Sequence, residues 1–174
     1  MKIAITGTSK LAKACMETIE ANWYACRIEN AKTAIDISDV FINQAHQDWN
    51  QVNLFDSFFK AWKDKDNKHI INISSRAAQP NISKGYLYSA QKAALNHYTN
   101  NVVYNSDKVC KITNINLGLL NHNLPSLTYS TVAEYIKWIL DQPSYIEIPD
   151  ITLQHRANYQ DVQAKKDALR NANV

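Results

Sequence analysis

Short apolar segments alternate with segments of helical periodicity along this chain, and no other feature constrains its fold as strongly. Apolar runs of strand length occur at 2–6, 24–28, 39–43, 68–74, 111–117 and 145–153. Stretches with apolar residues three or four positions apart lie at 11–19, 49–62, 88–104 and 131–140, and segment 30–37 fits a short helix or a loop. This order predicts an α/β structure, with a parallel sheet covered by helices on both faces.

The composition is that of a soluble globular protein, with 45% hydrophobic and 20% charged residues among 174. We expect one domain over 1–157 and a polar tail over 158–174, whose pattern allows a helix. No apolar run approaches the ~20 residues of a membrane span. Three scattered cysteines without ligand spacing indicate a reducing, cytoplasmic setting and no metal site. A net charge of +3 is too small to indicate a nucleic-acid partner.

Polar clusters follow four of the predicted strands. They are Gly7–Lys10, Asn43–His46, Ser74–Arg76 and Gly118–Asn121, and they include two of the three glycines in the chain. The carboxyl ends of parallel strands meet at one edge of a sheet, where ligands bind in folds of this type. The four clusters are therefore predicted to converge on one binding site.

The segment Tyr88-Ser-Ala-Gln-Lys92 carries the strongest chemical signal. Residues 88 and 92 share one face of a helix, where an ammonium group would lower the pKa of a phenol from its usual ~10. Such a phenol can act as a general acid or base. Ser75, at the end of the preceding predicted strand, could hydrogen-bond a substrate oxygen beside it. Alone, this Tyr–Lys spacing is common on helix surfaces, so the interpretation depends on its context.

In that context, the chain resembles the short-chain dehydrogenase/reductase family from residue 2 to about 122. Ile71–Ser75 followed by Tyr88 and Lys92 is similar to the serine, tyrosine and lysine of that family, and Asn53 is similar to its asparagine. The resemblance implies a Rossmann-like, doubly wound, three-layer α/β/α fold. It also implies that Tyr88 is the acid/base, that Lys92 holds the nicotinamide ribose, and that Ser75 orients the substrate while Asn53 supports a water relay.

The reaction implied by the resemblance is the interconversion of an alcohol and a carbonyl, by hydride transfer with NAD or NADP. A small carbonyl or alcohol would be the substrate, and a homodimer or homotetramer is expected. The resemblance places the cofactor against Gly7, Thr8, Ser9, Lys10, Leu11, Glu29, Asn43, Gln44, Ala45, Tyr88, Lys92 and Gly118. Glu29 would favour NAD, whereas Lys10 with Arg27 or Lys32 would favour NADP, and the sequence leaves both open.

Several departures from the family pattern favour a second hypothesis. The first turn, Thr6-Gly-Thr-Ser-Lys-Leu-Ala12, is one residue short and lacks two glycines that let the backbone approach a pyrophosphate. His46 stands where a glycine would face the cofactor. The chain is also shortened after the second strand, between residues 28 and 43. The alternative is a non-catalytic binding or scaffold protein with a weakened cofactor site.

Other candidate residues have more than one interpretation. His122 and Arg76 lie where they could contact a substrate, although a solvent-exposed arginine is an ordinary feature of a loop. The aromatic residues at 49, 58, 59 and 62 fit a pocket, the core or a subunit interface. Gln154–Arg156 could close over the site or lie in a subunit contact.

Overall fold

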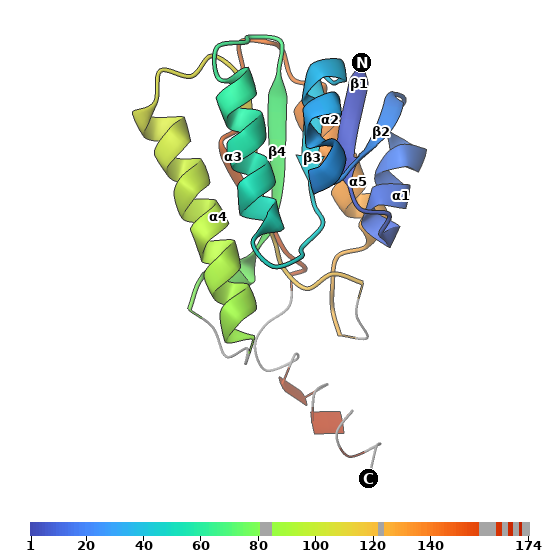
Figure 1. The fold of residues 1–174 in the computed structure, drawn as a ribbon. Helices are drawn as coiled ribbons and strands as arrows, with labels where there is room; N and C mark the ends of the chain where they lie inside the picture. Colours follow the sequence, from blue (N-terminus) through green and yellow to red (C-terminus); the bar gives the residue numbers. More distant parts are fainter. Residues whose placement is uncertain (81–84, 122–123, 157–162, 165–166, 169–170, 172–174) are drawn as a thin grey trace.

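The strands of the computed structural model form one parallel sheet (Figure 1). The structure describes residues 1–80, 85–121, 124–156, 163–164, 167–168 and 171. Within these residues the sheet order is β2-β1-β3-β4-β5-β6, and every neighbouring pair is parallel. The strands are β1 Lys2–Thr6, β2 Asn22–Cys26, β3 Val40–Asn43, β4 His69–Ser75, β5 Lys111–Leu117 and β6 Asp150–Leu153.

Helices cover both faces of this sheet, as predicted. They are α1 Lys10–Thr18, α2 Ala31–Ile37, α3 Asn50–Trp62, α4 Tyr86–Asn105 and α5 Tyr129–Leu140, with short 3₁₀ turns η1 Ile28–Asn30 and η2 Arg76–Ala78. Helices α1 and α5 pack together on one face, and α2, α3 and α4 cover the other (Figure 1). The prediction of a Rossmann-like, doubly wound three-layer structure is therefore confirmed.

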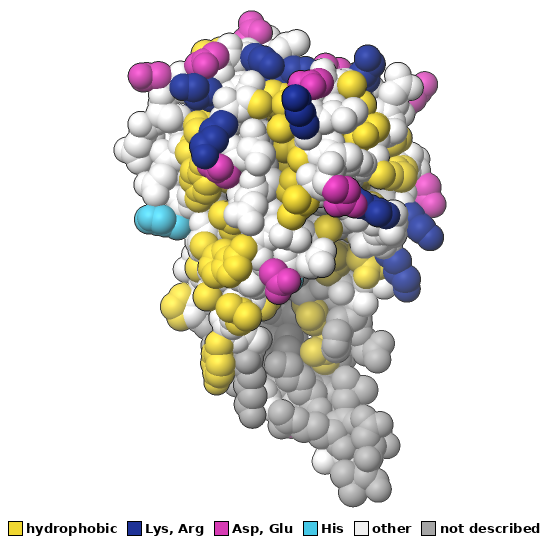
Figure 2. All heavy atoms as spheres, in the orientation of Figure 1, with side chains coloured by type: hydrophobic (Ala, Val, Ile, Leu, Met, Phe, Trp, Pro, Cys, Tyr) yellow, Lys and Arg dark blue, Asp and Glu magenta, His cyan; other side chains and the backbone are white. Residues whose placement is uncertain are grey.

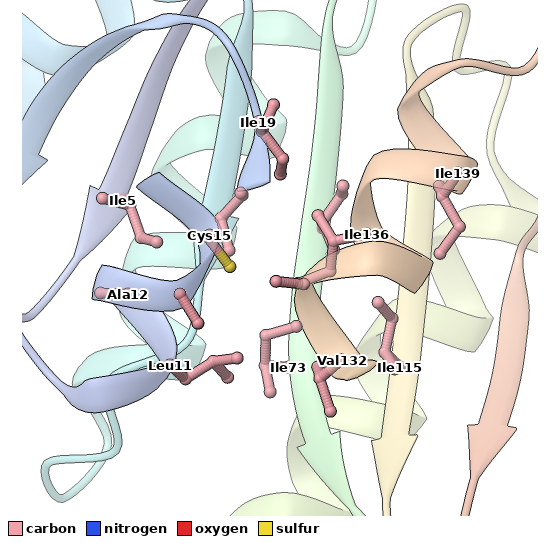
Figure 3. Packing of buried hydrophobic residues seen from close by; sticks show 14 of the residues in the cluster. Ile5, Leu11, Ala12, Cys15, Ile19, Ile73, Ile115, Val132, Ile136 and Ile139 are labelled. Atoms are coloured by element: carbon pink, nitrogen blue, oxygen red, sulfur yellow. The ribbon is translucent and has the colours of Figure 1, made fainter. Parts of the chain in front are cut away.

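Aliphatic side chains fill the layer between the sheet and the α1–α5 pair (Figure 3). Successive strand residues point to opposite faces, so Ile3 and Ile5 of β1 enter this layer whereas Ala4 enters the other. Ile136 and Ile139 of α5 belong to the same cluster and enter this layer from one face of that helix. Removal of these side chains from water anchors α1, whose first residues border the carboxyl edge of the sheet.

Aromatic side chains fill the opposite layer. The rings of Phe41 and Phe58 stack with centroids 3.6 Å apart, and Trp62 donates a hydrogen bond from its indole nitrogen to Ile35 O at 3.1 Å. Phe58, Phe59 and Trp62 are buried here, which decides among their three interpretations in favour of the core. Trp49 is 45% exposed and does not join them.

Each layer also contains buried thiols. Cys15 lies in the α1–α5 layer, and Cys26 and Cys110 lie in the aromatic layer. Burial raises the pKa of Cys15 and of Cys26 to about 12 and that of Cys110 to about 11. The thiols therefore have the inert character of small apolar side chains.

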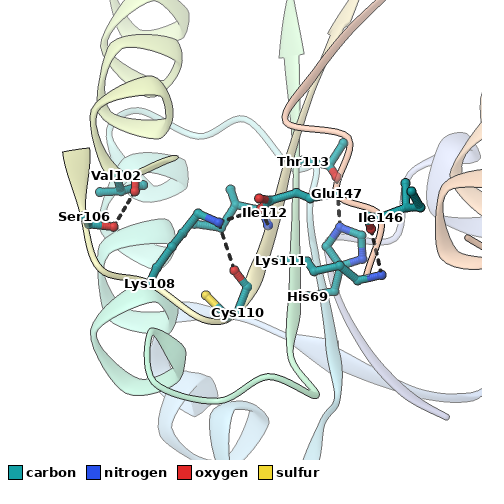
Figure 4. A network of polar contacts seen from close by, with 10 residues as sticks. All are labelled: His69, Val102, Ser106, Lys108, Cys110, Lys111, Ile112, Thr113, Ile146 and Glu147. Carbon is teal, nitrogen blue, oxygen red and sulfur yellow. Dashed lines mark hydrogen bonds and ion pairs between the residues drawn. The ribbon is translucent and has the colours of Figure 1, made fainter. Parts of the chain in front are cut away.

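Some element boundaries differ from the sequence prediction. Strand β2 begins at Asn22 and ends at Cys26, and the ambiguous segment 30–37 forms α2 after η1. Strand β6 covers only Asp150–Leu153, because residues 146–147 are held differently (Figure 4). Glu147 Oε1 binds Lys108 Nζ at 2.7 Å and accepts the Ile112 backbone N–H at 2.8 Å, so this segment caps the start of β5.

Two predictions fall wholly or largely on residues outside those described. His122 is one of them. Most of the predicted tail over 158–174 is also outside, and its described positions 163–164, 167–168 and 171 have helical backbone. Among the described residues, no helix combines the length and the apolar character needed to cross a bilayer.

Candidate active site

The polar clusters that follow β1, β3, β4 and β5 meet at the carboxyl edge of the sheet, at the bottom of Figure 1. A pocket of about 270 Å³ opens there, which we call the central pocket. Its lining includes Ser9, Gln44, Ser75, Tyr88, Lys92 and Gly118. Three of the four predicted catalytic residues thus share one hollow with four further predicted cofactor residues, Ser9, Leu11, Gln44 and Gly118.

Lys92 is the buried charge of this pocket. Its side chain is on the second turn of α4, and the residue is only 3% exposed. The ammonium donates to Gln51 Oε1 at 2.6 Å and to Ile73 O at 2.9 Å, and it lies 5.7 Å from the centroid of the Tyr88 ring. Burial lowers the pKa of Lys92 to about 8. Among the described residues no carboxylate forms an ion pair with it.

Ser75 and Tyr88 present their hydroxyl groups from two different elements. Ser75 ends β4, and its Oγ accepts the backbone N–H of Ala77 at 3.1 Å, which caps η2. A serine that accepts in this way still has its own hydrogen to donate. Tyr88 is in the first turn of α4 and is 37% exposed, so its phenol is accessible from solvent.

The structure does not bring Asn53 to this site. Asn53 lies on the exposed face of α3, and it is Gln51 that reaches Lys92. The two residues are about 200° apart around the helix axis, so they cannot share a face. Gln51 is four residues before Phe55 and seven before Phe58, which are both buried. The apolar periodicity of the helix therefore indicates that Gln51 lies on the buried face. The resemblance of Asn53 to a family motif obscured that signal.

Gln51 also connects three elements below the pocket. Its amide nitrogen donates to Asn43 O at 2.7 Å and to Ile73 O at 2.8 Å, which joins α3 to β3 and β4. The Asn43 side chain donates to Gln51 O at 2.8 Å and to Asn72 Oδ1 at 2.9 Å. Asn43 is fully buried, and its side chain holds strands and helix together. It does not line the central pocket, as a cofactor contact would.

The turn between β1 and α1 contains the other predicted cofactor residues. Gly7 has a φ of +74°, and a Cβ there would lie 3.0 Å from Ala45 Cβ and 3.0 Å from Gln44 Nε2. Ser9 caps α1 by accepting the Ala12 N–H at 3.2 Å, and it donates to Gln44 Oε1 at 3.0 Å. Because the Gln44 amide also donates to Thr6 O, the Gln44 side chain bridges the two ends of the turn.

The side chains around this turn differ in exposure. Thr8 and Lys10 are exposed, and neither lines the central pocket. Leu11 is buried and contributes an apolar wall to the central pocket. The turn therefore presents backbone groups and one hydroxyl to a ligand, rather than charged side chains.

A second hollow of about 440 Å³, the outer pocket, lies on the other side of the turn. Thr6, Gly7, Arg27, Glu29 and Ala45 are among the residues that line it. The Arg27 guanidinium is 3.7 Å from the Glu29 carboxylate, and both side chains are largely exposed. The outer pocket therefore contains the Glu29 carboxylate, the acceptor expected for the ribose of NAD, and the Arg27 guanidinium, a cation that would suit the phosphate of NADP.

Gly118 and Arg76 complete the edge near β6. A Cβ on Gly118 would lie 3.0 Å from Gln154 Cβ, so this glycine allows the chain after β6 to pack closely. Gln154 in turn accepts a hydrogen bond from the Arg76 guanidinium. Arg76 is therefore tied to the end of β6, outside the central pocket.

The chain matches no protein-family model and no curated protein. Its structure is similar to that of serine dehydrogenase from Escherichia coli, with a TM-score of 0.71 and 16% identity over 91% of this chain and 100% of that chain. A short-chain dehydrogenase/reductase from Vibrio parahaemolyticus gives a TM-score of 0.69 and 16% identity, over 89% and 100% of the two chains.

A third solved structure, the 3-alpha-hydroxysteroid dehydrogenase from Pseudomonas sp. B-0831 complexed with NADH, gives a TM-score of 0.68 and 16% identity over 88% of this chain and 94% of that chain. These likenesses define the class of fold as an open, parallel α/β sheet with helices on both faces. More particularly, the chain has the fold of the short-chain dehydrogenases and reductases, as the sequence resemblance predicted.

Proposed function

We propose that the chain is an oxidoreductase that interconverts a small alcohol and a carbonyl with NAD or NADP. The observation that carries this proposal is the buried Lys92 ammonium, which lies beside an accessible phenol and a serine hydroxyl. No carboxylate of the described residues forms an ion pair with it. A buried cation with only neutral partners destabilises a fold. Groups that are perturbed in this way and line a pocket are typical of functional sites.

The two pockets support a nicotinamide dinucleotide as the cofactor. The outer pocket would hold the adenosine half beside Glu29 and Arg27, and the central pocket would hold the nicotinamide half beside Lys92. Gly7 lines the outer pocket and adds no side chain of its own to it. When bound, such a cofactor supplies the hydride donor or acceptor for the reaction.

The chain supplies the proton chemistry and the orientation of the substrate. Ser75 would donate a hydrogen bond to the substrate oxygen, and Tyr88 would give a proton to that oxygen or take one from it. The Lys92 charge would favour the ribose hydroxyls and the proton transfer at Tyr88. Leu11, Leu117 and Leu120 would exclude water from one side of the central pocket.

One observation favours the alternative of a non-catalytic binding protein. Gln44 hydrogen-bonds to both ends of the β1–α1 turn and lies over Gly7, where a pyrophosphate would approach. A dinucleotide must therefore displace these hydrogen bonds or pass beside them. If a dinucleotide can do neither, the chain has the fold but does not bind the cofactor.

A calorimetric titration with NADH and with NADPH separates the two functions. Binding of either nucleotide at micromolar to low millimolar concentration is expected for the oxidoreductase, and heat-free titrations with both nucleotides would establish the alternative. Turnover is then measured with 2-butanol, cyclohexanol and 1-phenylethanol and with the corresponding ketones. These probes are small enough for the central pocket.

The variant Tyr88→Phe tests the assignment of the acid/base. Loss of the phenol oxygen is expected to lower turnover by at least about a hundredfold, because proton transfer contributes that much in such sites. Cofactor affinity should stay within about twofold, because the ring remains in place. Turnover equal to that of the wild-type protein would refute the role of Tyr88.

A further inference from the structure

A histidine lies against the proposed acid/base. His46 follows β3, and its ring meets the Tyr88 ring edge to face, with centroids 4.7 Å apart and an angle of 85° between the planes. Both residues line the central pocket. The His46 side chain is exposed, so the imidazole is in contact with Tyr88 and with solvent at the same time. Rings at this separation are in direct contact.

The other side of the site offers no such connection among the described residues. Behind Tyr88, the Lys92 ammonium donates to the Gln51 side-chain oxygen and to the Ile73 carbonyl. Amide oxygens accept hydrogen bonds but do not exchange protons near neutral pH. Gln51 is only 2% exposed, and its own amide nitrogen is bound to backbone oxygens. The two groups that accept hydrogen bonds from Lys92 therefore cannot pass a proton on.

The proposed reaction requires a route for one proton in each turnover. Oxidation of an alcohol leaves the substrate hydroxyl proton on Tyr88, and this proton must leave before the next cycle. A substrate in the central pocket would cover the phenol, because Tyr88 lines that pocket. His46 lines the same pocket and reaches solvent, so it stands where a route can exist.

We propose, on the basis of the oxidoreductase function above, that His46 is a proton relay between Tyr88 and solvent. In the oxidation direction, the substrate O–H bond breaks and its proton passes to the Tyr88 phenolate, while the hydride leaves for the oxidised nicotinamide. The phenol then gives the proton, through a water, to a neutral His46 nitrogen. The imidazolium finally releases it to solvent, and the cycle is balanced.

The surroundings of His46 favour the proton-accepting form. Burial and the Lys92 charge lower the pKa of His46 below 6.5, and the nearby Asp48 carboxylate opposes this effect. Tyr88 and Lys92 face the ring from α4, and Asp48 belongs to the same loop as His46. The imidazole is therefore neutral at pH 7, and oxidation is expected to slow as the pH falls through its pKa.

An NMR titration of the imidazole nitrogens tests the contact without any substrate. In the wild-type protein, His46 should titrate below pH 6.5. In Lys92→Met its pKa should rise, and in Tyr88→Phe its nitrogen signals should move. A His46 titration that is identical in all three proteins would overturn the proposal. His97, which is exposed farther along α4, serves as the reference imidazole.

The kinetic experiment uses His46→Ala, with His97→Ala as the matched control. Oxidation of the probe alcohols at pH 7 should slow at least about tenfold in His46→Ala only. The acidic limb of the pH profile should disappear, and added imidazole should restore much of the rate. Cofactor affinity should not change. A His46→Ala protein with the wild-type rate and pH profile would overturn the relay. A loss of rate that comes with weaker cofactor binding and that imidazole does not restore would also overturn it.

The two proposals fail in different ways. If the wild-type protein binds neither NADH nor NADPH, the oxidoreductase function is refuted and the relay with it. If the wild-type protein turns over and His46→Ala does the same, only the relay is refuted. Tighter nucleotide binding in His46→Ala with unchanged turnover would mean that the ring obstructs the cofactor, which also overturns the relay.

Discussion

At the scale of single residues, Gln51 is the residue of α3 that contacts the buried lysine of the site. Its side-chain oxygen is 2.6 Å from the Lys92 ammonium, and its side-chain nitrogen holds the ends of β3 and β4. A neutral amide satisfies the hydrogen bonds of the ammonium but does not neutralise its charge. Lys92 therefore keeps a pKa of about 8, whereas an acidic partner would raise it.

The variant Gln51→Glu tests this reasoning, because it keeps the size of the side chain and adds a charge. The pKa of Lys92 should rise by roughly one unit or more, since an opposite charge at this distance favours the ammonium. An NMR titration of the lysine Nζ measures it. Asn53→Asp adds the same charge two residues away on the exposed face, and it should leave the pKa of Lys92 almost unchanged. Equal shifts in the two variants would contradict the geometry.

At the scale of elements, the turn between β1 and α1 is where the fold and the site depend on each other. Its shortness follows from the missing residue in the sequence, and Ser9 begins α1 directly as its cap. The Gln44 backbone N–H donates to Thr6 Oγ1 at 2.8 Å, as does that of Ala45, so the segment after β3 is fixed to the end of β1. Gly7 lies between these contacts.

The substitution Gly7→Ala should destabilise the protein by about 2 kcal/mol, because a non-glycine residue at positive φ is strained. The added Cβ would also lie 3.0 Å from Ala45 Cβ. Urea denaturation measures the change in the free energy of unfolding. Thr8→Ala, at the exposed neighbouring position, should stay within about 0.5 kcal/mol. A Gly7→Ala protein as stable as wild type would show that the turn adjusts easily.

Most elements could be predicted because the apolar pattern decides them. Strand β1 and the end of α3 lie where the periodicity placed them, and Ser75, Tyr88 and Lys92 share a pocket as predicted. The apolar pattern predicted the wrong structure where tertiary contacts determine the conformation. Residues 146–147 look like a strand, but Glu147 pairs with Lys108, which is 39 residues away. The resemblance to a family motif predicts Asn53 as the site residue of α3, whereas the apolar periodicity of this helix places Gln51 on the buried face.

At the scale of the whole molecule, the edge of the sheet opposite the site contains a buried histidine. His69 begins β4, is 7% exposed and shares a 2.9 Å hydrogen bond with Thr113 Oγ1 (Figure 4). Burial, together with the Lys111 and Lys108 charges, lowers the pKa of His69 to about 3. In the unfolded chain the ordinary value is ~6.5, so the unfolded state binds more protons between these two values.

The folded protein should therefore lose stability as the pH falls from 6.5 towards 3. At pH 4 the His69 contribution to this loss is about 3 kcal/mol. The variant His69→Gln can keep a hydrogen bond to Thr113 but does not titrate, so its loss between pH 7 and pH 4 should be smaller by that amount. Urea denaturation at the two pH values measures it. His97→Gln, at an exposed position, should decline as wild type does.

Charge on the face shown in Figure 2 is mixed, with Lys and Arg interspersed among Asp and Glu. Hydrophobic side chains gather near the start of α4, where Tyr86 is 76% and Leu87 is 63% exposed. Phe58, Phe59 and Trp62, for which a subunit interface was one interpretation, lie in the core. An oligomer remains a prediction that sedimentation can check, and this exposed apolar turn is the place to examine first.

The placement of the three cysteines gives the molecule an internal reporter on each side of its sheet. Native thiols this deeply enclosed should resist alkylation by iodoacetamide until the surrounding layer opens. Cys15 then reports on the α1–α5 side, and Cys26 with Cys110 on the other. If the sheet joins both sides into one cooperative unit, mass spectrometry of pulse-labelled protein should find either no labels or three, with few chains in between.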